Sequence, residues 1–539
     1  MSTFAPASTT PTRQLAHQNL GALNKYDFFL AAGLGMVGFL AYLTTLAPGL
    51  LPGDSGEFQV LGYFYSTAHT TGYAIYLLLA KVFSLLPVED IAYRINLFSA
   101  VMAGVTLGLL FLAGRLVSGS RMGAALASAS LALSATFWSQ AIIAEVYTTA
   151  SAFFTAIVLL LLLAAQATSA AARGRRLFLA GLLGGLGMGV HGSIVLLAPA
   201  AAFWLLAHAS LRRAWLPASG GAAIGLALMT GAFFVMDNNR AAYNSFNAIY
   251  IPAASAWNSE PQSLDNPAAR FQFMITARQW RMAMFRDPGA VMVVNAQKYG
   301  DTLQADFAWI FPALALLGTL SLWRRDWRLA TFLLVALLSH HVYTFNYEIG
   351  DLYVFFISAY VLMVLLAAAG IAQLSAWAAG WGQLNFRLVQ IGVGLVCLVL
   401  LLAPTAAERL AALRAGEAHF SFYWHKPENE LASWRSALRS TVRDLEPNAI
   451  LMADWYDLYP YYYVAYIEMD RSDLRFIEAR PAADPPGLSA SAVQFIQLTC
   501  QTRPVYFGMA MEELPYAGIE TIKKRVGSVT LFKVIQPLP

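Results

Sequence analysis

The chain has 539 residues, of which 58% are hydrophobic and only 12% charged, with a formal net charge of +4. Soluble domains carry about 25% charged residues, so this composition excludes an ordinary soluble protein. The positive excess is too small to indicate nucleic-acid binding. Apolar runs such as AIVLLLLLAA and LVQIGVGLVCLVLLLA predict a polytopic α-helical membrane protein, with the lipid bilayer as its main partner.

The N-terminal stretch is polar and has no small-residue cleavage site after a short apolar core. We therefore expect an uncleaved signal anchor, preceded by a cytoplasmic tail at 1–27. One cysteine lies in an apolar run and the other in the C-terminal region, so we expect no disulfide between Cys397 and Cys500.

About eleven segments approach the roughly 20 apolar residues that cross a bilayer as a helix. They lie at 28–48, 92–116, 121–140, 146–167, 177–190, 193–208, 217–236, 306–322, 329–345, 353–376 and 388–406. The two segments between 177 and 208 are each short for a span. The stretch GLLGGLGMGVHG there predicts close helix packing through small residues.

Basic residues near the span ends predict the orientation of the chain. Arg13, Lys25 and the loops at 173–176, 211–213 and 324–328 all fall on one side, the cytoplasm. The membrane domain then covers 28–406, and its outer side carries a first loop at 49–91, a long loop at 237–305 and everything from 407 to 539. We expect an integral protein of a bacterial inner or plasma membrane with its site facing outward.

The C-terminal region at 407–539 alternates strand-like and helical patterns. Strands are expected at 449–454, 474–479, 503–508 and 529–535, with a helical stretch, WYDLYPYYYVAYIEM, between the first two. This alternation predicts a small α/β domain on the outer side.

The first outer loop contains GDSGEF, in which Asp54 and Glu57 lie three residues apart. The segments SGEFQVLGYFYS and TTGYAIYLLLAKVFSLL both predict helices along the membrane face. Asp54 and Ser55 suit the start of the first helix, and Asp54 with Glu57 resembles a capping box. A purely structural role for the pair is thus one interpretation, and a catalytic role is the other.

Further polar residues map to the same outer level as this pair, although each alone could be a solvated loop residue. They are Asp54, Glu57, His69, Glu145, His191, Glu348 and Asp351. Ionisable groups gathered at the edge of hydrocarbon are costly, so together they predict a polar cavity that opens outward.

Arginines on the same side could bind phosphate, because the guanidinium fork matches phosphate oxygens. Arg94 follows the first loop, and Arg278 and Arg281 lie in the long outer loop. An interfacial helix that binds anionic lipid head groups is the alternative reading of the long-loop arginines.

Several short blocks of the chain form a recognisable series: GDSGEF, AHTTGYAIY, AYRIN, WSQAIIAEVYT, GMGVHGS and NYEIGDLYVFFISAY, with a weaker block at AILMADWYDLYPYYYVAYIE. Together they resemble a family of GT-C-type membrane glycosyltransferases. The family includes the eukaryotic transmembrane O-mannosyltransferases that act on plexin-type ectodomains, together with bacterial relatives. One departure is HTTGYA, where Thr70, Thr71 and Ala74 replace the prolines of the family pattern.

The resemblance implies transfer of a sugar from a polyprenyl-phosphate-linked donor to a hydroxyl of a protein or glycan acceptor. It implies Asp54 as the general base and Glu57 as its partner, with inversion at the anomeric carbon. Arg94 with Arg278 or Arg281 would hold the donor phosphate. His69, Glu145, His191, Tyr347 and Asp351 would support the site or bind substrate.

No metal-ligand spacing is evident, so we assign no metal and no certain cofactor, although an Asp/Glu/His cluster could hold a divalent cation. Two other functions remain open on the sequence alone. A transporter of a lipid-linked or small polar substrate would also use intramembrane carboxylates and Gly-broken helices. A non-catalytic envelope assembly protein would tolerate Asp54→Asn.

Overall fold

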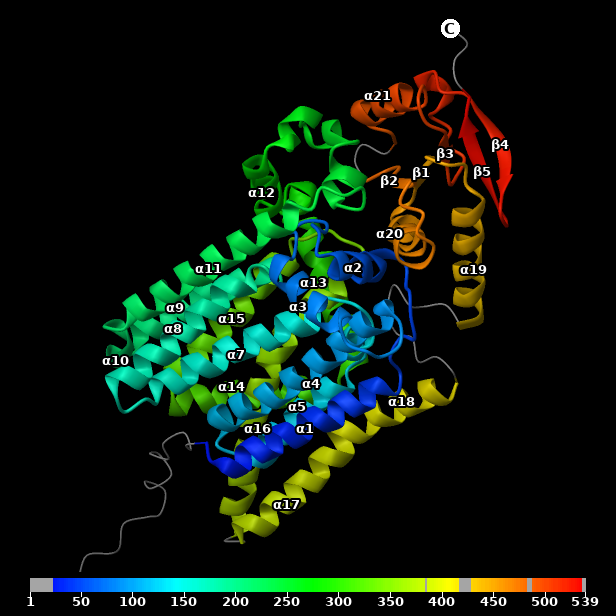
Figure 1. Ribbon diagram of the computed structural model, residues 1–539. Coiled ribbons are helices and arrows are strands. Elements are labelled where there is room, and N and C mark those ends of the chain that lie inside the picture. Colours follow the sequence, from blue (N-terminus) through cyan, green and yellow to red (C-terminus); the bar gives the residue numbers. More distant parts are fainter. Residues whose placement is uncertain (1–22, 383–384, 416–427, 482–486, 536–539) are drawn as a thin grey trace, which may run out of the picture.

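The computed structural model describes residues 23–382, 385–415, 428–481 and 487–535. Helices make up the chain as far as Arg414, and a small sheet with its own helices lies at one end of them (Figure 1). Most of the predicted N-terminal tail, 1–22, lies outside the described residues.

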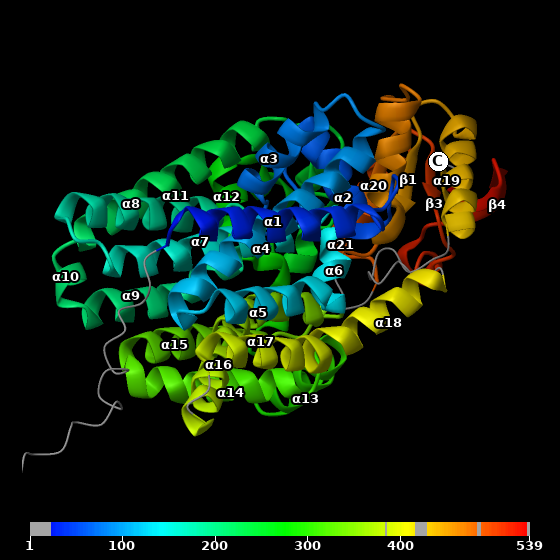
Figure 2. The same ribbon diagram turned by 90° about the horizontal axis from the view of Figure 1, so that it is seen from below.

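The membrane part is a bundle of long helices with shorter helices at one end. Its α-helices are α1 (Lys25–Leu43), α2 (Gly53–Phe64), α3 (Ala74–Ser84), α4 (Ile91–Ser118), α5 (Arg121–Leu133), α6 (Ala135–Ala141), α7 (Tyr147–Ala165), α8 (Ala170–Gly187), α9 (Ala198–Ala207), α10 (Ala209–Arg212), α11 (Trp215–Asp237), α12 (Pro267–Ile275), α13 (Ala290–Asp306), α14 (Ile310–Arg325), α15 (Trp327–Thr344), α16 (Ile357–Gly382), α17 (Phe386–Cys397) and α18 (Ala403–Arg414). In Figure 2, α8 and α11 lie on one side of the bundle and α14, α15 and α16 on the other, with α4 and α7 between them.

Six helices of the described chain are long and apolar enough to cross a membrane, or up to eight if two bent pairs each form one span. The prediction of a polytopic helical membrane protein is confirmed, but the count of eleven is not. All eleven predicted segments overlap helices. The pair α5 and α6 is bent by 69°, the pair α13 and α14 by 107°, and the helices at 177–190, 193–208 and 329–345 do not reach the length and apolarity of a span.

Glycines bring α8 and α11 into close contact, as the stretch GLLGGLGMGVHG predicts. A Cβ atom on Gly181 would lie 2.0 Å from the carbonyl oxygen of Ala218, and one on Gly221 would lie 2.0 Å from that of Phe178. Only hydrogen fits at these two positions, so the backbones of the two helices touch, as small residues allow between membrane helices.

The two helices predicted in the first outer loop are confirmed as α2 and α3. The capping-box interpretation of Asp54 and Glu57 is wrong. The residue before α2 is Pro52, no side chain caps this end, and Asp54 lies within the first turn. The carboxylate of Glu57 instead binds His69. Neither carboxylate therefore has the helix-capping role that would have explained its presence structurally.

The long loop after α11 is folded rather than extended. It contains short helices, η3 (Phe246–Tyr250), η4 (Ala254–Trp257), η5 (Pro261–Asp265) and η6 (Arg278–Ala283), in addition to α12 and α13. A buried ion pair fixes it to the end of α11, because Arg270 lies 2.7 Å from Asp237 and each side chain is only 1% exposed. Arg270 also donates to the side-chain oxygen of Asn244 at 2.9 Å.

The C-terminal region forms a five-stranded sheet of strand order β2-β1-β3-β5-β4. Its elements are α19 (Glu428–Asp444), β1 (Ile450–Ala453), α20 (Trp455–Tyr463), η9 (Val464–Glu468), β2 (Arg475–Glu478), α21 (Ala490–Thr499), β3 (Val505–Phe507), β4 (Thr521–Val526) and β5 (Val529–Val534). Strand β1 pairs in parallel with β2 and β3, with Leu451 opposite Phe476 and Tyr506. Strand β5 runs antiparallel to β3 and β4.

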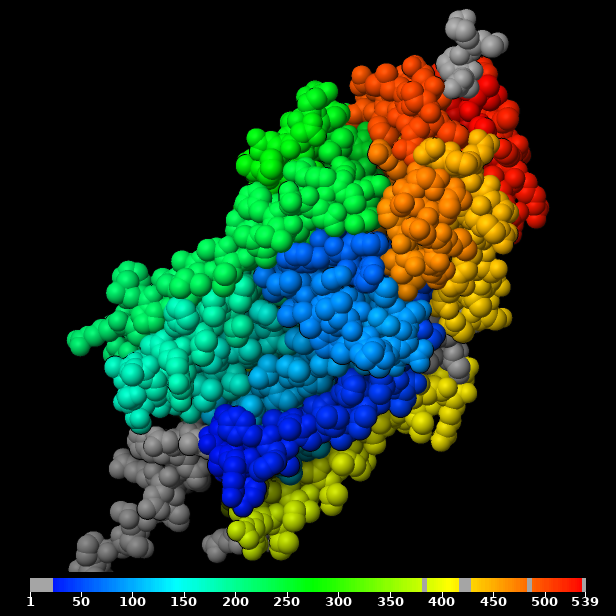
Figure 3. Space-filling view, in the orientation of Figure 1, coloured from blue at the N-terminus to red at the C-terminus, as the bar shows by residue number. Residues whose placement is uncertain are grey.

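The four predicted strands of the α/β domain are present, and β4 was missed because its sequence, TIKKRV, is charged and largely exposed. The helix that leads toward the domain extends to Arg414, past the predicted boundary at 406. Figure 3 shows the orange segment that contains α20 packed directly against the blue first loop. A Cβ on Gly56 of α2 would lie 2.9 Å from Cδ of Pro460 in α20, so the two helices touch.

Candidate active site at one end of the helix bundle

Helix α2 carries two carboxylates, one beside a cavity and one buried in the protein. Gly53 has a φ of 62°, a value that glycine adopts without strain, and it turns the chain from Pro52 into the helix. Asp54 in the first turn lines a cavity, whereas Glu57, one turn later, is completely buried. The two side chains therefore lie close together but only one of them reaches the space where a ligand fits.

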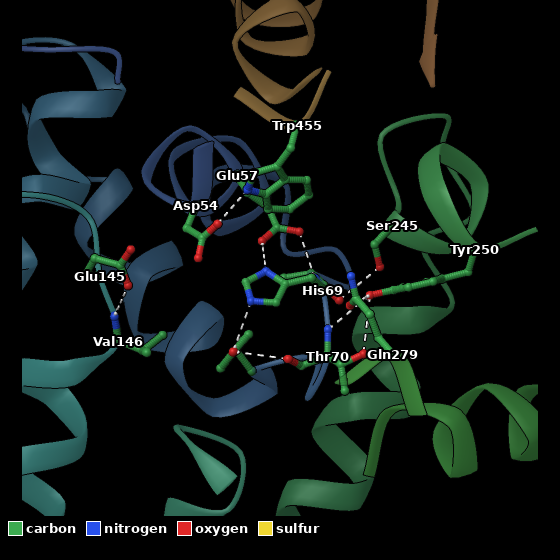
Figure 4. Close-up of polar contacts among 12 residues, drawn as sticks. Asp54, Glu57, His69, Thr70, Glu145, Val146, Ser245, Tyr250, Gln279 and Trp455 are labelled. Carbon is green, nitrogen blue, oxygen red and sulfur yellow. Dashed lines mark hydrogen bonds and ion pairs between the residues drawn. The ribbon is translucent and has the colours of Figure 1, made fainter. Parts of the chain in front are cut away.

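Glu57 binds His69, which follows α2 in the first outer loop. The backbone N–H of His69 donates to Oε1 of Glu57 at 2.8 Å, and Nδ1 of its imidazole lies against Oε2 (Figure 4). The other ring nitrogen of His69 lies 3.1 Å from the hydroxyl of Tyr73. Burial alone would lower the pKa of His69, but the carboxylates of Glu57 and Asp54 outweigh it and raise the pKa to about 9. The imidazole is thus a cation at neutral pH.

Polar contacts continue from His69 into the long loop. The hydroxyl of Tyr250 accepts from the backbone N–H of Thr70 at 3.2 Å and donates to the side-chain oxygen of Gln279 at 2.6 Å. The hydroxyl of Ser245 donates to the carbonyl of Ala68 at 2.9 Å. These bonds join the first loop to helices η3 and η6.

Asp54 has a partner in the C-terminal domain. The indole N–H of Trp455 donates to Oδ1 of Asp54 at 2.7 Å (Figure 4). The two residues are 401 positions apart. No pattern in the sequence connects them, so this contact could not be found without the structure.

A cavity of about 500 Å³ opens beside Asp54. Its polar lining comes from the first loop, the turn after α8 and the turn after α15, and its apolar lining comes mainly from η2 (Gly192–Leu197), the end of α12, η6 and η7 (Leu352–Phe356). The predicted residues on its wall are Asp54, His69, His191, Tyr347, Glu348 and Asp351. Residues on its wall that the sequence did not single out include Tyr147, Trp280, Tyr343 and Phe355.

Asp351 and His191 have pKa values shifted in opposite directions. Burial and the nearby charge of Asp54 raise the pKa of Asp351 to about 6. Burial and the charge of His69 lower the pKa of His191 to about 4, so this imidazole is neutral. The ring of His191 lies 5.3 Å from that of Tyr147 and 6.2 Å from that of Tyr73.

Glu145 is buried and is not among the residues that line the cavity. It is 3% exposed, and its Oε2 accepts from the backbone N–H of Val146 at 3.2 Å. Burial, followed by the charges of Asp54 and Asp351, raises its pKa well above the usual value. A neutral Glu145 would avoid adding a charge to the acidic group around Asp54.

A second buried carboxyl approaches Glu57 from the C-terminal domain. Glu478, the last residue of β2, is 8% exposed, and its Oε2 has no hydrogen-bond partner. Burial and the charge of Glu57 raise the pKa of Glu478 to about 8. The domain interface therefore contains an acid that is protonated at neutral pH.

The three predicted arginines do not line the cavity. The guanidinium of Arg94 binds the carbonyls of Ser84, Val88 and Glu89, and so it holds the end of the first loop. That of Arg278 binds the carbonyls of Trp257 and Asn258. Arg281 is exposed on η6, next to the cavity residue Trp280. In the described part of the chain, no group of three or more His, Cys, Asp or Glu side chains is placed to hold a metal ion.

Comparison with known proteins gives a family and a relative that each match part of the chain. Residues 54–214 match the family described as "Protein O-mannosyl-transferase TMEM260 N-terminal domain". The Protein O-mannosyl-transferase TMEM260 of Mus musculus is 36% identical over 115 residues, which are 21% of this chain and 16% of the mouse protein. The matched part is thus a small share of that relative's length.

Solved structures match over nearly the whole chain at low identity. ArnT from Cupriavidus metallidurans bound to undecaprenyl phosphate has a TM-score of 0.57 at 14% identity, covering 94% of this chain and 97% of ArnT. The apo oligosaccharyltransferase of Archaeoglobus fulgidus has a TM-score of 0.52 at 14% identity, covering 91% of this chain and 70% of that one. The predicted resemblance is confirmed: residues 54–214 are similar to the N-terminal domain of the TMEM260 protein O-mannosyl-transferases, and the chain shares the fold of ArnT and of the archaeal oligosaccharyltransferase.

Proposed function

We propose that this protein is an inverting glycosyltransferase that moves a sugar from a polyprenyl-phosphate-linked donor to the hydroxyl of a protein or glycan. The observation that carries the proposal is the cavity of about 500 Å³ beside Asp54, in a fold shared with ArnT. One carboxylate reaches this cavity with a fixed orientation, and a second, Glu57, is already bound to His69.

Asp54 is the general base in this mechanism. Its second oxygen takes the proton of the acceptor hydroxyl as that oxygen attacks the anomeric carbon. The bond between this carbon and the phosphate oxygen breaks, and the lipid phosphate leaves with the electron pair. Attack opposite the leaving group inverts the anomeric centre.

Positive charge must balance the phosphate that leaves. The imidazolium of His69 faces the cavity, and Glu57 keeps it protonated. Of the three arginines assigned to the phosphate, we retain Arg281, because the guanidinium groups of Arg94 and Arg278 are bound to backbone carbonyls. Asp351 and Tyr347 also line the cavity, and we assign to them the binding of sugar hydroxyls.

The site would face the extracytoplasmic side, which the basic loops at 173–176 and 324–328 favour. The relative's name suggests mannose and a protein acceptor as the first pair to test. Purified protein is incubated with polyprenyl-phosphate sugars, beginning with mannose, and with the host's envelope fraction, and the product mass is measured. A mass increase of one sugar residue on an acceptor is expected. If folded protein gives no product with any donor, the proposal fails.

A further inference from the structure

The C-terminal domain contributes one side chain to the surroundings of Asp54. Trp455 is the first residue of α20, and the carboxylate of Asp454 caps this helix by accepting from the backbone N–H of Asp457 at 3.1 Å. The cap fixes where α20 begins and thus the position of the Trp455 backbone. The indole N–H then reaches Oδ1 of Asp54 at 2.7 Å.

The indole also packs against His69. The two ring centroids are 5.6 Å apart and the rings are nearly perpendicular, at 88°. Trp455 therefore contacts both the base and the cation of the proposed mechanism. In Figure 4 it approaches Asp54 from the side of α20.

Several contacts prevent α20 from moving away from α2. Pro460 packs on the bare backbone of Gly56. The hydroxyl of Tyr463 accepts from the backbone N–H of Ala92 at 3.3 Å, and Nε of Arg435 in α19 donates to the carbonyl of Leu50 at 3.0 Å. The indole is thus held by the domain interface and not by Asp54 alone.

We propose that Trp455 is a positioning residue, whose indole N–H fixes one oxygen of Asp54 so that the other oxygen points at the acceptor hydroxyl. This inference rests on the proposed function. A carboxylate with one oxygen bound has one rotamer and one free oxygen, and a base must lie within hydrogen-bond reach of the proton it removes. Without the N–H, Asp54 rotates and only part of its population is aligned.

Trp434 provides a matched control in the same domain. Its indole N–H also donates to a carboxylate, Oδ1 of Asp457, at 2.8 Å, and its ring is also half-buried. Trp434 does not line the cavity and does not contact Asp54. Loss of its N–H removes a bond of the same kind without touching the base.

The experiment compares three variants of the full-length protein in detergent or liposomes. They are Trp455→Phe, Trp434→Phe, and a Trp455 variant that carries 3-benzothienylalanine, in which sulfur replaces the N–H and the ring shape is kept. For both changes at Trp455 we expect kcat to fall about 10- to 100-fold, the effect of losing one hydrogen bond to a charged group. We expect KM for the donor to stay within about twofold of wild type, because donor binding does not use this bond.

Trp434→Phe is expected to keep the kcat of wild type. Equal falls in kcat in both phenylalanine variants would overturn the inference and indicate a structural role only. A wild-type kcat in the benzothienyl variant would also overturn it, because that variant keeps the packing and lacks only the N–H.

A second readout does not depend on transfer. A water-soluble carbodiimide labels accessible carboxyls, and peptide mass mapping reports the labelling of Asp54. We expect faster labelling of Asp54 in both Trp455 variants than in wild type or Trp434→Phe. If wild type transfers no sugar, the proposed function fails, whereas equal labelling of Asp54 in all four proteins would overturn the positioning role itself.

Discussion

The backbone N–H and the imidazole of His69 both bind the same carboxylate, that of Glu57, inside the first outer loop. Both side chains are buried, so each charge depends on the other for its stabilisation. The loop that carries the proposed base is therefore closed by a charge pair whose state depends on pH.

The pH dependence of stability follows from this pair. The pKa of His69 rises from 6.5 to about 9 on folding, so the folded protein binds the extra proton more tightly than the unfolded chain. Its contribution to stability is complete below pH 6.5 and is lost as the pH rises toward 9. We expect the Tm in detergent to fall across this window in wild type. Glu57→Gln should have a lower Tm at pH 6.5 and a flatter profile, and parallel profiles would contradict the assignment.

Asp54→Asn tests the base directly. Asparagine keeps the size of the side chain and can still contact Trp455, but it cannot accept the proton. We expect kcat to fall about 100- to 10,000-fold, the usual contribution of a general base. The Tm should stay close to that of wild type. Asp265→Asn, an exposed acid outside the cavity, is the control and should keep full activity.

Glu478→Gln is expected to stabilise the protein above neutral pH. Burial raises the pKa of Glu478 from 4.5 to about 8, so folding favours its neutral form. Wild type loses stability through this group as the pH rises from 4.5 to 8, and the loss is complete above pH 8. Glutamine carries no charge at any pH. The Tm of the variant should thus exceed that of wild type at pH 8.5 and match it near pH 4.5; a lower Tm at pH 8.5 would show that the charged form is stabilised.

Arg270→Met should strongly destabilise the protein. It would leave the charge of Asp237 buried without its main partner, which costs about 3–5 kcal/mol in the free energy of unfolding. Arg240 also faces Asp237, but at 3.6 Å and with 37% of its side chain exposed. Arg240→Met should therefore cost less than about 1 kcal/mol. SDS titration of both variants measures the difference, and equal losses would show that the burial of Arg270 does not matter.

Much of the site could be predicted from sequence because it lies on short helices and turns that the chain brings to one end of the bundle. Asp54, His69, His191 and Asp351 line one cavity, as expected from their predicted place at the same level of the bundle. Contacts that depend on packing were not predictable. Nothing in the first loop indicates that Glu57 turns inward to His69, or that Trp455 reaches Asp54.

The role of the arginines could not be predicted from sequence either. A basic residue close to a site in sequence can bind backbone carbonyls of its own loop instead of a ligand, as Arg94 binds those of Ser84 and Glu89. The span count differed for a related reason, since apolar length alone does not reveal bends such as the 107° between α13 and α14. Secondary structure could be predicted from local sequence patterns, whereas the partners of each side chain are determined by the fold.

The contact of Gly56 with Pro460 has a consequence for protein engineering. A methyl group at position 56 would overlap Pro460 and the carbonyl of Leu51, so α2 and α20 fit only as a matched pair. A chimaera that takes its C-terminal domain from a relative must take α2 from the same relative, or α2 and α20 will not pack against each other. Helix α2 and the C-terminal domain are in this sense one inherited unit, although most of the chain lies between them.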